Sequence, residues 1–200
     1  MTSCKQNIVE YRGAVRRRHR EELNQHKSAV FWLTGLSGSG KSTLAHLVEE
    51  RLHGMDMRTY VFDGDNVRKG LCRDLSFSPE GRSENIRRIG EMVKLFTDAG
   101  IMCLTAFISP YREDREKVRC AVGREDFYEI YVKCPLDVCE ERDVKGLYSL
   151  ARQGKIKNYT GVSSPYEEPE NPDLVLETDQ CSVEECVSQL TEFIVSSLRF

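Results

Sequence analysis

The amino-acid sequence predicts an α/β fold in which helices cover both faces of a parallel β-sheet. Short apolar segments alternate with segments of helical pattern, which indicates right-handed crossovers between parallel strands. A glycine-rich turn stands between the first apolar segment and the helix that follows it. The 200 residues suffice for one good-sized core, and no internal repeat or low-complexity linker divides them. We therefore expect one domain that binds its ligands at the carboxyl ends of the strands.

Five segments are expected to form the strands because they are short, apolar and bounded by turn residues. The first, "AVFWLT", has the composition of a buried strand, and the second, "RTYVFD", ends in a carboxylate. The predicted strands are residues 29–34, 58–63, 101–108, 127–132 and 173–178.

Helices are predicted in the segments between these strands and at the end of the chain. The longest begins after Pro79, carries Ile86, Ile89, Val93 and Phe96 at helical spacing, and ends at "DAG". The other predicted helices lie within residues 41–53, 109–122, 135–143 and 182–198.

The chain is expected to divide into an N-terminal arm, residues 1–28, and a single domain, residues 29–200. Within the domain, residues 144–172 are rich in Lys, Gly, Tyr, Pro and Glu without a strong period, which predicts a functional lid. The basic run from Val15 to Arg20 is expected to be solvated and partly mobile, with an RNA-binding arm as the alternative. The 29 basic and 32 acidic residues give a net charge of −3, so no general attraction to nucleic acid is expected.

Composition and segment lengths also exclude several protein classes. The N-terminal "MTSCKQNIVEYRG" has no apolar h-region, so no signal peptide is expected. The runs "AVFWL" and "AFI" are too short to cross a bilayer, so no membrane partner is expected. Eight cysteines lack any C-x-x-C pair, and the pairs Cys134/Cys139 and Cys181/Cys186 do not have zinc-knuckle spacing. Reduced thiols in a cytoplasmic protein are the expectation.

The segment "GLSGSGKS" matches the phosphate-binding pattern G-x-x-x-x-G-K-[ST] between a predicted strand and a predicted helix. Its glycines let backbone N–H groups turn toward phosphate oxygens, and the helix N-terminus adds its positive dipole end. Lys41 is expected to reach the β- and γ-phosphates, and the Ser42 hydroxyl to bind Mg²⁺. The predicted nucleotide-binding residues are Gly35, Leu36, Ser37, Gly38, Ser39, Gly40, Lys41, Ser42 and Thr43.

This motif predicts a nucleoside triphosphate but does not name the reaction. A GTPase of the Ras type would need an N-K-x-D segment to read the base, and the sequence has none. A motor ATPase would not fit into one domain of this length. A small-molecule kinase fits, because it needs only a phosphate cradle, an acceptor pocket and a lid.

Two carboxylates follow the second predicted strand, in "DGDN". Asp63 or Asp65 could accept or orient the proton of an acceptor hydroxyl, and either could hold water on Mg²⁺. The alternative is a turn that caps a helix starting near Asn66. Both hold if Asp65 or Asn66 supplies the cap while Asp63 faces the substrate.

An anionic acceptor is indicated by the residues that come next. Guanidinium groups bind phosphate or sulfate oxygens with two parallel N–H bonds, and Arg68 and Arg82 could supply them. Asn85 lies three residues after Arg82 and therefore shares its helical face. Phe77 precedes the long helix, where it could be a hydrophobic staple or a stacking plate for a base.

These segments carry a family resemblance. "FWLTGLSGSGKSTLA", "FDGDNVRKGL", "LSFSPEGRSENIRRIG", "FISPYREDRE" and "RDVKGLY", in this order, resemble the adenylylsulfate kinase (APS kinase) family in its bacterial stand-alone form. The likeness runs from about residue 5 to the last helix. It implies a P-loop kinase fold and transfer of the γ-phosphate of ATP, with Mg²⁺, to the ribose 3′-hydroxyl of adenylyl sulfate. The products would be ADP and 3′-phosphoadenylyl sulfate.

The resemblance also implies a role for each matching residue. Asp63 would lie near the acceptor hydroxyl, Asp65 near the metal, and Phe77 and Tyr159 on either side of the substrate adenine. Ser109 matches a position described as a phosphoserine intermediate, which in-line transfer does not require; a turn before Pro110 is the alternative. The implied acceptor site comprises Asp63, Arg68, Phe77, Arg82, Asn85, Ile108, Ser109, Lys145, Leu147 and Tyr159, and Arg142 would lie near the ATP adenine.

Three positions depart from the family pattern. Tyr159 stands where Phe is usual and keeps a ring for stacking. Ser163 replaces an aspartate in the same loop, "GVSSPYE". Gly81 replaces an acid beside Arg82, which removes a negative charge and loosens the start of the helix.

Two other readings stay open from the sequence. One is a different small-acceptor P-loop kinase, such as a nucleoside or sugar-acid kinase. The other is a non-catalytic module that sequesters nucleotide or docks a sulfurylase. The resemblance further implies a homodimer, with the N-terminal arm in the contact, and an association with ATP sulfurylase.

Overall fold

A five-stranded parallel sheet forms the centre of the computed structural model, which describes residues 9, 11 and 13–198. The strand order is β2-β3-β1-β4-β5, and each neighbouring pair is parallel. The α/β prediction is therefore confirmed. The strands are β1 (Val30–Thr34), β2 (Thr59–Asp63), β3 (Met102–Ala106), β4 (Phe127–Lys133) and β5 (Leu174–Glu177).

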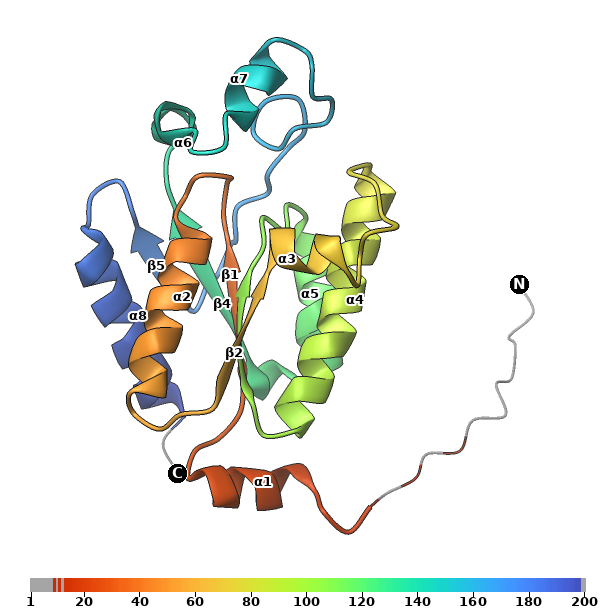
Figure 1. Ribbon diagram of the computed structural model, residues 1–200, viewed down its shortest axis with the longest axis vertical. Helices are drawn as coiled ribbons and strands as arrows, with labels where there is room; N and C mark the ends of the chain where they lie inside the picture. The colour runs from red at the N-terminus through yellow and green to blue at the C-terminus, as the bar shows by residue number, and fades with distance from the viewer. Residues whose placement is uncertain (1–8, 10, 12, 199–200) are drawn as a thin grey trace.

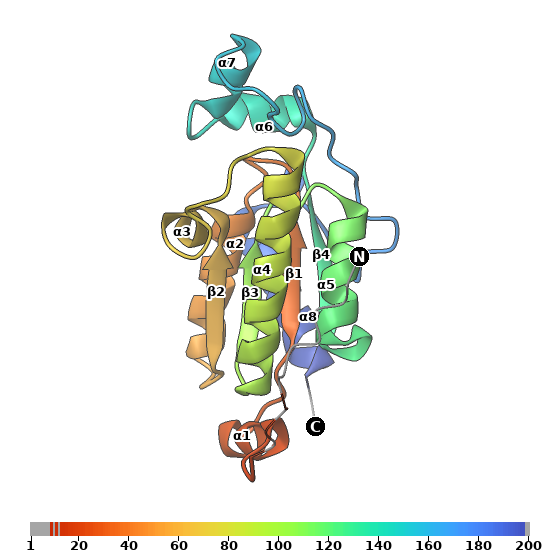
Figure 2. The same cartoon turned by 90° about the vertical axis from the view of Figure 1, so that its right-hand side faces the viewer.

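Helices cover both faces of this sheet (Figure 1). Helices α2 and α8 lie on one face and α4 and α5 on the other, while α6 and α7 stand above the carboxyl edge (Figure 2). The predicted helix 41–53 is confirmed to the residue, and the other predicted helices to within a few residues. The helices are α1 (Arg17–Asn24), α2 (Lys41–His53), α3 (Gly64–Lys69), α4 (Pro79–Asp98), α5 (Arg112–Val122), α6 (Leu136–Arg142), α7 (Leu147–Arg152) and α8 (Val183–Ser197), with a 3₁₀ turn at Arg124–Asp126.

The buried strand β1 divides the core between the two faces. Because side chains alternate along a strand, Phe31 points into the cluster under α2 and α8, whereas Trp32 points into the cluster under α4 and α5. Both residues are fully buried. A third, small cluster, which we call the lid cluster, lies above the sheet: Leu36, Cys134, Leu136, Val138, Cys139, Tyr148, Tyr159 and Val162.

Local sequence signals fix where the long helices begin. Ser78 caps α4, its hydroxyl accepting from the Gly81 N–H at 3.1 Å, and Pro79 occupies the first turn. Ser182 and Glu185 form a reciprocal capping box at α8, with distances of 3.2 and 2.8 Å. These caps satisfy N–H groups that the first turn of a helix leaves unpaired.

The basic run near the N-terminus is attached to the domain. Helix α1 lies below the amino edge of the sheet (Figure 1). Arg17 forms an ion pair with Asp126, with Nη2 and Oδ1 2.8 Å apart, and Arg20 donates to the Asp98 carbonyl at 2.9 Å. The expectation of a solvated, mobile run was therefore wrong for these two arginines. Positions 1–8, 10 and 12 of the expected arm lie outside the described residues.

The predicted lid segment, residues 144–172, also contains structure that the sequence pattern did not indicate. It includes α7 and a turn closed by the bridge between Thr160 and Ser164. Among residues 9, 11 and 13–198, none of the helices has both the length and the apolar character needed to cross a bilayer.

Candidate active site

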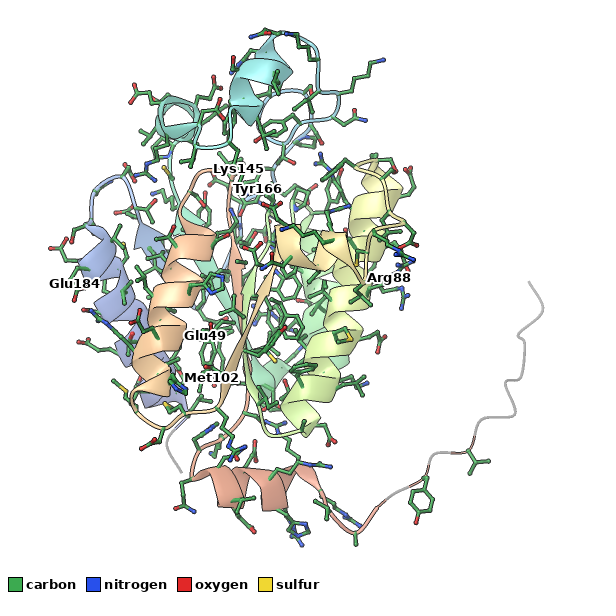
Figure 3. The ribbon with its side chains drawn as sticks, in the orientation of Figure 1. Glu49, Arg88, Met102, Lys145, Tyr166 and Glu184 are labelled. Atoms are coloured by element: carbon green, nitrogen blue, oxygen red, sulfur yellow. The ribbon has the colours of Figure 1, made fainter. Side chains whose placement is uncertain are left out.

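A cavity of about 770 Å³ opens at the carboxyl edge of the sheet, between the strand ends and the lid. Its volume lies in the usual range for ligand pockets. Of the residues predicted for the site, all line the cavity except Gly35, Leu36 and Ser39. The side chains of Lys145 and Tyr166 mark this edge in Figure 3. The structure thus brings the predicted donor and acceptor residues into one space.

The phosphate cradle forms the floor of this cavity. A Cβ atom at Gly35 would overlap the Val132 carbonyl of the neighbouring strand, so glycine is required there. The Lys41 Nζ points back into the loop and donates to the Leu36 carbonyl at 2.6 Å and the Ser39 hydroxyl at 3.3 Å. Burial lowers the pKa of Lys41 to about 8. Nucleotide phosphates would offer this ammonium its missing counter-charge.

Asp63 connects the cradle with the acceptor side. Its Oδ2 accepts from the Ser42 hydroxyl at 2.6 Å, while its Oδ1 accepts from the Asp65 N–H at 2.9 Å and caps α3. Asp63, the residue predicted to face the substrate, is therefore also the cap of α3, which differs from the expectation that Asp65 or Asn66 would cap. Asp65 forms an ion pair with Lys145 of the lid.

Arg68 and Arg82 lie together at the predicted acceptor end of the cavity. The guanidinium of Arg68 lies 4.2 Å from the centroid of the Phe77 ring. Phe77 is 63% exposed. In a hydrophobic staple it would contact an apolar side chain at the fourth residue of α4, but that residue is Arg82, so the staple interpretation is not supported. Arg82 donates to the Phe77 carbonyl at 3.0 Å and to Asn158 and Thr160 of the lid. Phe77 therefore presents an exposed ring to the cavity, with the Arg68 guanidinium against it.

Three further side chains form the inner wall. Asn85 is 4% exposed, and its Oδ1 has no hydrogen-bond partner, so it offers an acceptor to a ligand. Ile108 lines the cavity, and its carbonyl accepts from Thr34 at 2.7 Å. Ser109 is buried at φ 39°; its hydroxyl accepts from Trp32 Nε1 and donates to Thr34 Oγ1, both at 3.0 Å. These bonds satisfy Ser109 as part of the wall.

Residues of α6 and of the lid reach the cavity from above. Arg142 donates to the Thr178 carbonyl at 2.6 Å and to the Gly38 carbonyl at 3.4 Å, which ties α6 to the cradle. Leu147 begins α7 and lines the cavity. The Tyr159 ring meets the Tyr148 ring edge to face, with centroids 5.0 Å apart.

The two other departures from the family pattern have local explanations. Ser163 accepts from the Tyr159 N–H at 3.0 Å, so it closes the lid turn with its hydroxyl. A Cβ atom at Gly81 would lie 2.5 Å from the Ser76 carbonyl oxygen. Gly81 is therefore required by the loop that presents Phe77, in addition to any effect on charge.

Sequence reasoning missed several residues that hold the site together. Thr178 donates to the Ser39 carbonyl at 2.9 Å, and Tyr148 donates to the Ser37 carbonyl at 2.9 Å. The buried Arg115 donates to the Ser109 and Glu167 carbonyls at 2.6 and 2.8 Å. The position of Tyr148 in "KGLY" and of Thr178 just after a strand offered a weak signal; Arg115 offered none.

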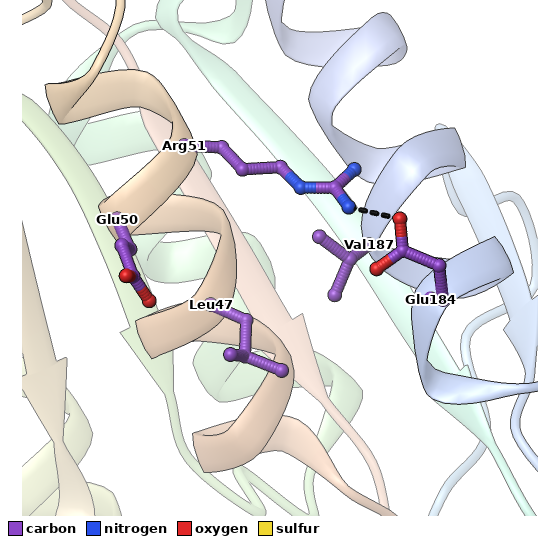
Figure 4. A pocket seen from close by; sticks show the side chains of 5 residues that line it. All are labelled: Leu47, Glu50, Arg51, Glu184 and Val187. Atoms are coloured by element: carbon purple, nitrogen blue, oxygen red, sulfur yellow. Dashed lines mark hydrogen bonds and ion pairs between the residues drawn. The ribbon is translucent and has the colours of Figure 1, made fainter.

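A smaller cavity of about 380 Å³ lies on the outer surface between α2 and α8, away from the strand ends (Figure 4). An ion pair between Arg51 and Glu184 crosses it. Leu47, Glu50 and Val187 complete its lining. It brings together no constellation of nucleophile, base or anion-binding groups.

The model of the adenylylsulphate kinase family matches residues 27–177. This chain belongs to the adenylylsulfate kinase family. It is 58% identical over 188 residues to an adenylyl-sulfate kinase of Acaryochloris marina, covering 94% of this chain and 92% of the relative. The resemblance seen in the sequence is thereby confirmed.

Solved adenylylsulfate kinases share the fold. An APS kinase of Mycobacterium tuberculosis in complex with AMPPNP and APS is 44% identical, has a TM-score of 0.80, and the match covers 84% of this chain and 98% of that one. A hexameric APS kinase of Thiobacillus denitrificans is 30% identical, with a TM-score of 0.64 over 86% of this chain and 30% of that longer chain.

Proposed function

We propose that this adenylylsulfate kinase transfers the γ-phosphate of ATP to the 3′-hydroxyl of adenylyl sulfate. The products are 3′-phosphoadenylyl sulfate and ADP, so the enzyme acts in sulfate activation. The observation that carries the proposal is that one cavity holds the phosphate cradle and Asp63 together with the guanidinium groups of Arg68 and Arg82 and the rings of Phe77 and Tyr159. The family membership and the APS named for the Mycobacterium tuberculosis relative support this acceptor.

Transfer in this site is mainly a matter of position and charge. Lys41 binds the β- and γ-phosphates, which replace its contacts with the loop. Arg68 and Arg82 bind the phosphosulfate anion, and Phe77 and Tyr159 hold the adenine between them. Asp63 orients the 3′-hydroxyl toward the γ-phosphate, either as an acceptor of its hydrogen bond or as the base that removes its proton.

The residues around Ser42 fit a magnesium ion. The donor set is a hydroxyl and a carboxylate oxygen, the hard ligands that Mg²⁺ prefers. Within the described part of the chain, no group of three or more His, Cys, Asp or Glu side chains could form a cage, so phosphate oxygens and water would complete the coordination. Ser42 and Asp63, with Asp65 nearby, would hold the ion, which neutralises charge on the transferred phosphoryl group when bound.

Closure of the lid excludes water from the transfer. Arg82 and Lys145 hold the lid from two sides, the former through Asn158 and Thr160 and the latter through Asp65. Water at the γ-phosphate would compete with the acceptor hydroxyl and hydrolyse ATP.

A coupled assay of ADP release tests the proposal. Adenylyl sulfate, a nucleoside and gluconate are offered as acceptors, and 3′-phosphoadenylyl sulfate is identified by chromatography. Turnover of adenylyl sulfate alone is the expected result. Turnover of the nucleoside or gluconate without adenylyl sulfate would assign the site to another small-acceptor kinase. Unchanged transfer by both Lys41→Ala and Asp63→Ala would refute the assigned roles.

Self-association is also part of this proposal. The hexameric relative from Thiobacillus denitrificans supports assembly of this chain with itself, and a homodimer is the simplest symmetric form. Association with ATP sulfurylase rests on the family resemblance, and a cytoplasmic location rests on the N-terminal sequence without an apolar h-region and on the expected reduced thiols. Light scattering after size-exclusion chromatography, with and without a sulfurylase, measures both kinds of association; a monomer under all conditions would contradict them.

A further inference from the structure

Tyr148 lies between the two halves of the cavity and has contacts with each. It stands in the first turn of α7, and its side chain is only 2% exposed. Its hydroxyl donates to the Ser37 carbonyl of the cradle at 2.9 Å. Its ring meets the Tyr159 ring edge to face, at an interplanar angle of 79° and a centroid distance of 5.0 Å. One side chain thus joins the phosphate loop to the predicted acceptor plate.

The backbone around Tyr148 is firmly held. Asp143 accepts from the N–H groups of Tyr148 and Ser149, at 3.0 and 3.1 Å, through its two separate oxygens. This bidentate contact satisfies two N–H groups in the first turn of α7. The side chain is therefore fixed at its base as well as at its tip.

The lid packs closely around the same point. Tyr148, Leu36 of the cradle and Leu136 of α6 all belong to the lid cluster. A Cβ atom at Gly161 would lie 3.0 Å from the Leu136 side chain and 3.2 Å from that of Leu36. The loop that carries Tyr159 therefore rests directly on the cradle, with little free space between them.

The hydrogen bond to the cradle has a fixed sense. A carbonyl oxygen only accepts, so the Tyr148 hydroxyl must donate. Burial raises the pKa of Tyr148 well above its usual range, so the hydroxyl keeps its proton at every pH at which the enzyme is assayed. Whether this hydrogen bond forms therefore depends on the position of the Ser37 carbonyl and not on the pH.

We propose that Tyr148 is a positioning residue that couples occupancy of the phosphate cradle to the placement of Tyr159 in the acceptor site. Phosphates entering the cradle draw Lys41 away from the Leu36 carbonyl and fix the loop that includes Ser37. The Tyr148 hydroxyl keeps its hydrogen bond to the Ser37 carbonyl and moves with it. The Tyr148 ring then sets the orientation of the Tyr159 ring that it contacts. The inference rests on the proposed function, because it takes Tyr159 as the plate for the substrate base.

Coupling of this kind is reciprocal. If a donor nucleotide strengthens binding of adenylyl sulfate by a given factor, adenylyl sulfate strengthens binding of the nucleotide by the same factor. A single hydrogen bond of typical net worth corresponds to about five-fold in an equilibrium constant. Loss of the Tyr148 hydroxyl should therefore reduce the coupling factor by about five-fold.

The test compares Tyr148→Phe, which keeps the ring, with the parent enzyme. Tyr60→Phe is the matched control, because Tyr60 lies on β2 with half of its surface exposed and does not line the cavity. Isothermal titration calorimetry measures adenylyl sulfate binding with and without AMPPNP, and AMPPNP binding with and without adenylyl sulfate. Melting temperatures establish that the parent and every variant are folded.

The expected result is a coupling factor about five-fold smaller in Tyr148→Phe in both titrations, with each ligand alone binding within two-fold of the parent. The control should match the parent. Tyr148→Leu, which also removes the ring, should weaken adenylyl sulfate both with and without AMPPNP. An unchanged coupling factor in Tyr148→Phe, an equal loss with and without AMPPNP, or no coupling in the parent would overturn the inference. Absence of turnover of adenylyl sulfate by the parent would instead refute the proposed function.

Discussion

Replacing Arg115 with methionine should destabilise the protein and loosen the attachment of the C-terminal part of the lid at Glu167. The Arg115 side chain is 2% exposed. Its Nε lies 2.5 Å from Glu129 Oε1, and its two other nitrogens donate to the carbonyls of Ser109 and Glu167. It therefore joins β4, the wall of the acceptor site and the end of the lid at one buried point.

The magnitude follows from what methionine leaves behind. Removing one partner of a buried ion pair costs about 3–5 kcal/mol in the free energy of unfolding, because the other charge stays buried. Glu129 keeps a weaker partner, Arg119, at 3.4 Å, which places the loss near the lower end. We expect a loss of about 3–4 kcal/mol, which corresponds to a fall in Tm of roughly 6–16 °C for a domain of this size.

Thermal unfolding followed by circular dichroism measures this loss. Arg124→Met is the control, because Arg124 pairs with Glu116 at the surface with 67% of its side chain exposed, and such pairs contribute about 0–1 kcal/mol. Adding Glu129→Gln to Arg115→Met should recover part of the loss, because it removes the unpaired charge. A fall in Tm no larger than that of the control, or no recovery in the double variant, would refute the reasoning.

Three further predictions concern the cradle and the acceptor side. Burial lowers the pKa of Lys41 from 10.5 to about 8. The buried charge therefore lowers the free energy of unfolding below pH 8, and this destabilisation fades as the pH rises to 10.5 and is absent above it. Lys41→Met should abolish transfer yet raise Tm at pH 7, and the gain in Tm should be gone near pH 11. Asp63→Asn keeps an oxygen to cap α3 and should lower kcat at least about 100-fold with little change in Tm, whereas Asp63→Ala should also lose about 1 kcal/mol of stability; equal Tm values for the two variants would contradict the cap. Gly81→Ala places a Cβ atom 2.5 Å from the Ser76 carbonyl oxygen, so the loop that carries Phe77 must shift. KM for adenylyl sulfate should therefore rise while KM for ATP stays constant. An unchanged KM for adenylyl sulfate would show that the loop accommodates the methyl group without displacing Phe77.

The strands and long helices could be predicted because their signals are local. Periodicity, Pro79 and the glycine-rich turn lie within each segment, and they placed α2 and α4 correctly. Helix α1 was missed because its anchors are distant in sequence, with Arg17 binding Asp126. Helix α7 was missed because its six residues are too few to show a period, and its position depends on the side chain of Asp143.

The site could be predicted to a similar extent and for the same reason. The cradle is one contiguous motif, so its residues could be predicted from spacing alone. The double role of Asp63 was not foreseen, because a carboxylate shows which groups its two oxygens meet only once Ser42 has been brought beside it. The role of Tyr148 could not be predicted either, because its hydroxyl meets the Ser37 carbonyl only in the folded chain.

The separation of the lid cluster from the two larger clusters has a consequence for cooperativity. The cores under α2 and α8 and under α4 and α5 both pack on the sheet, whereas the lid cluster has only three buried residues, Cys134, Cys139 and Tyr148. A unit with so few apolar contacts opens at a fraction of the global unfolding free energy. Amide protons of α7 should therefore exchange with deuterium long before those of β1, and they should slow when both nucleotides bind. The lid then behaves as a separate foldon, so it can open and close in every turnover while the sheet stays folded.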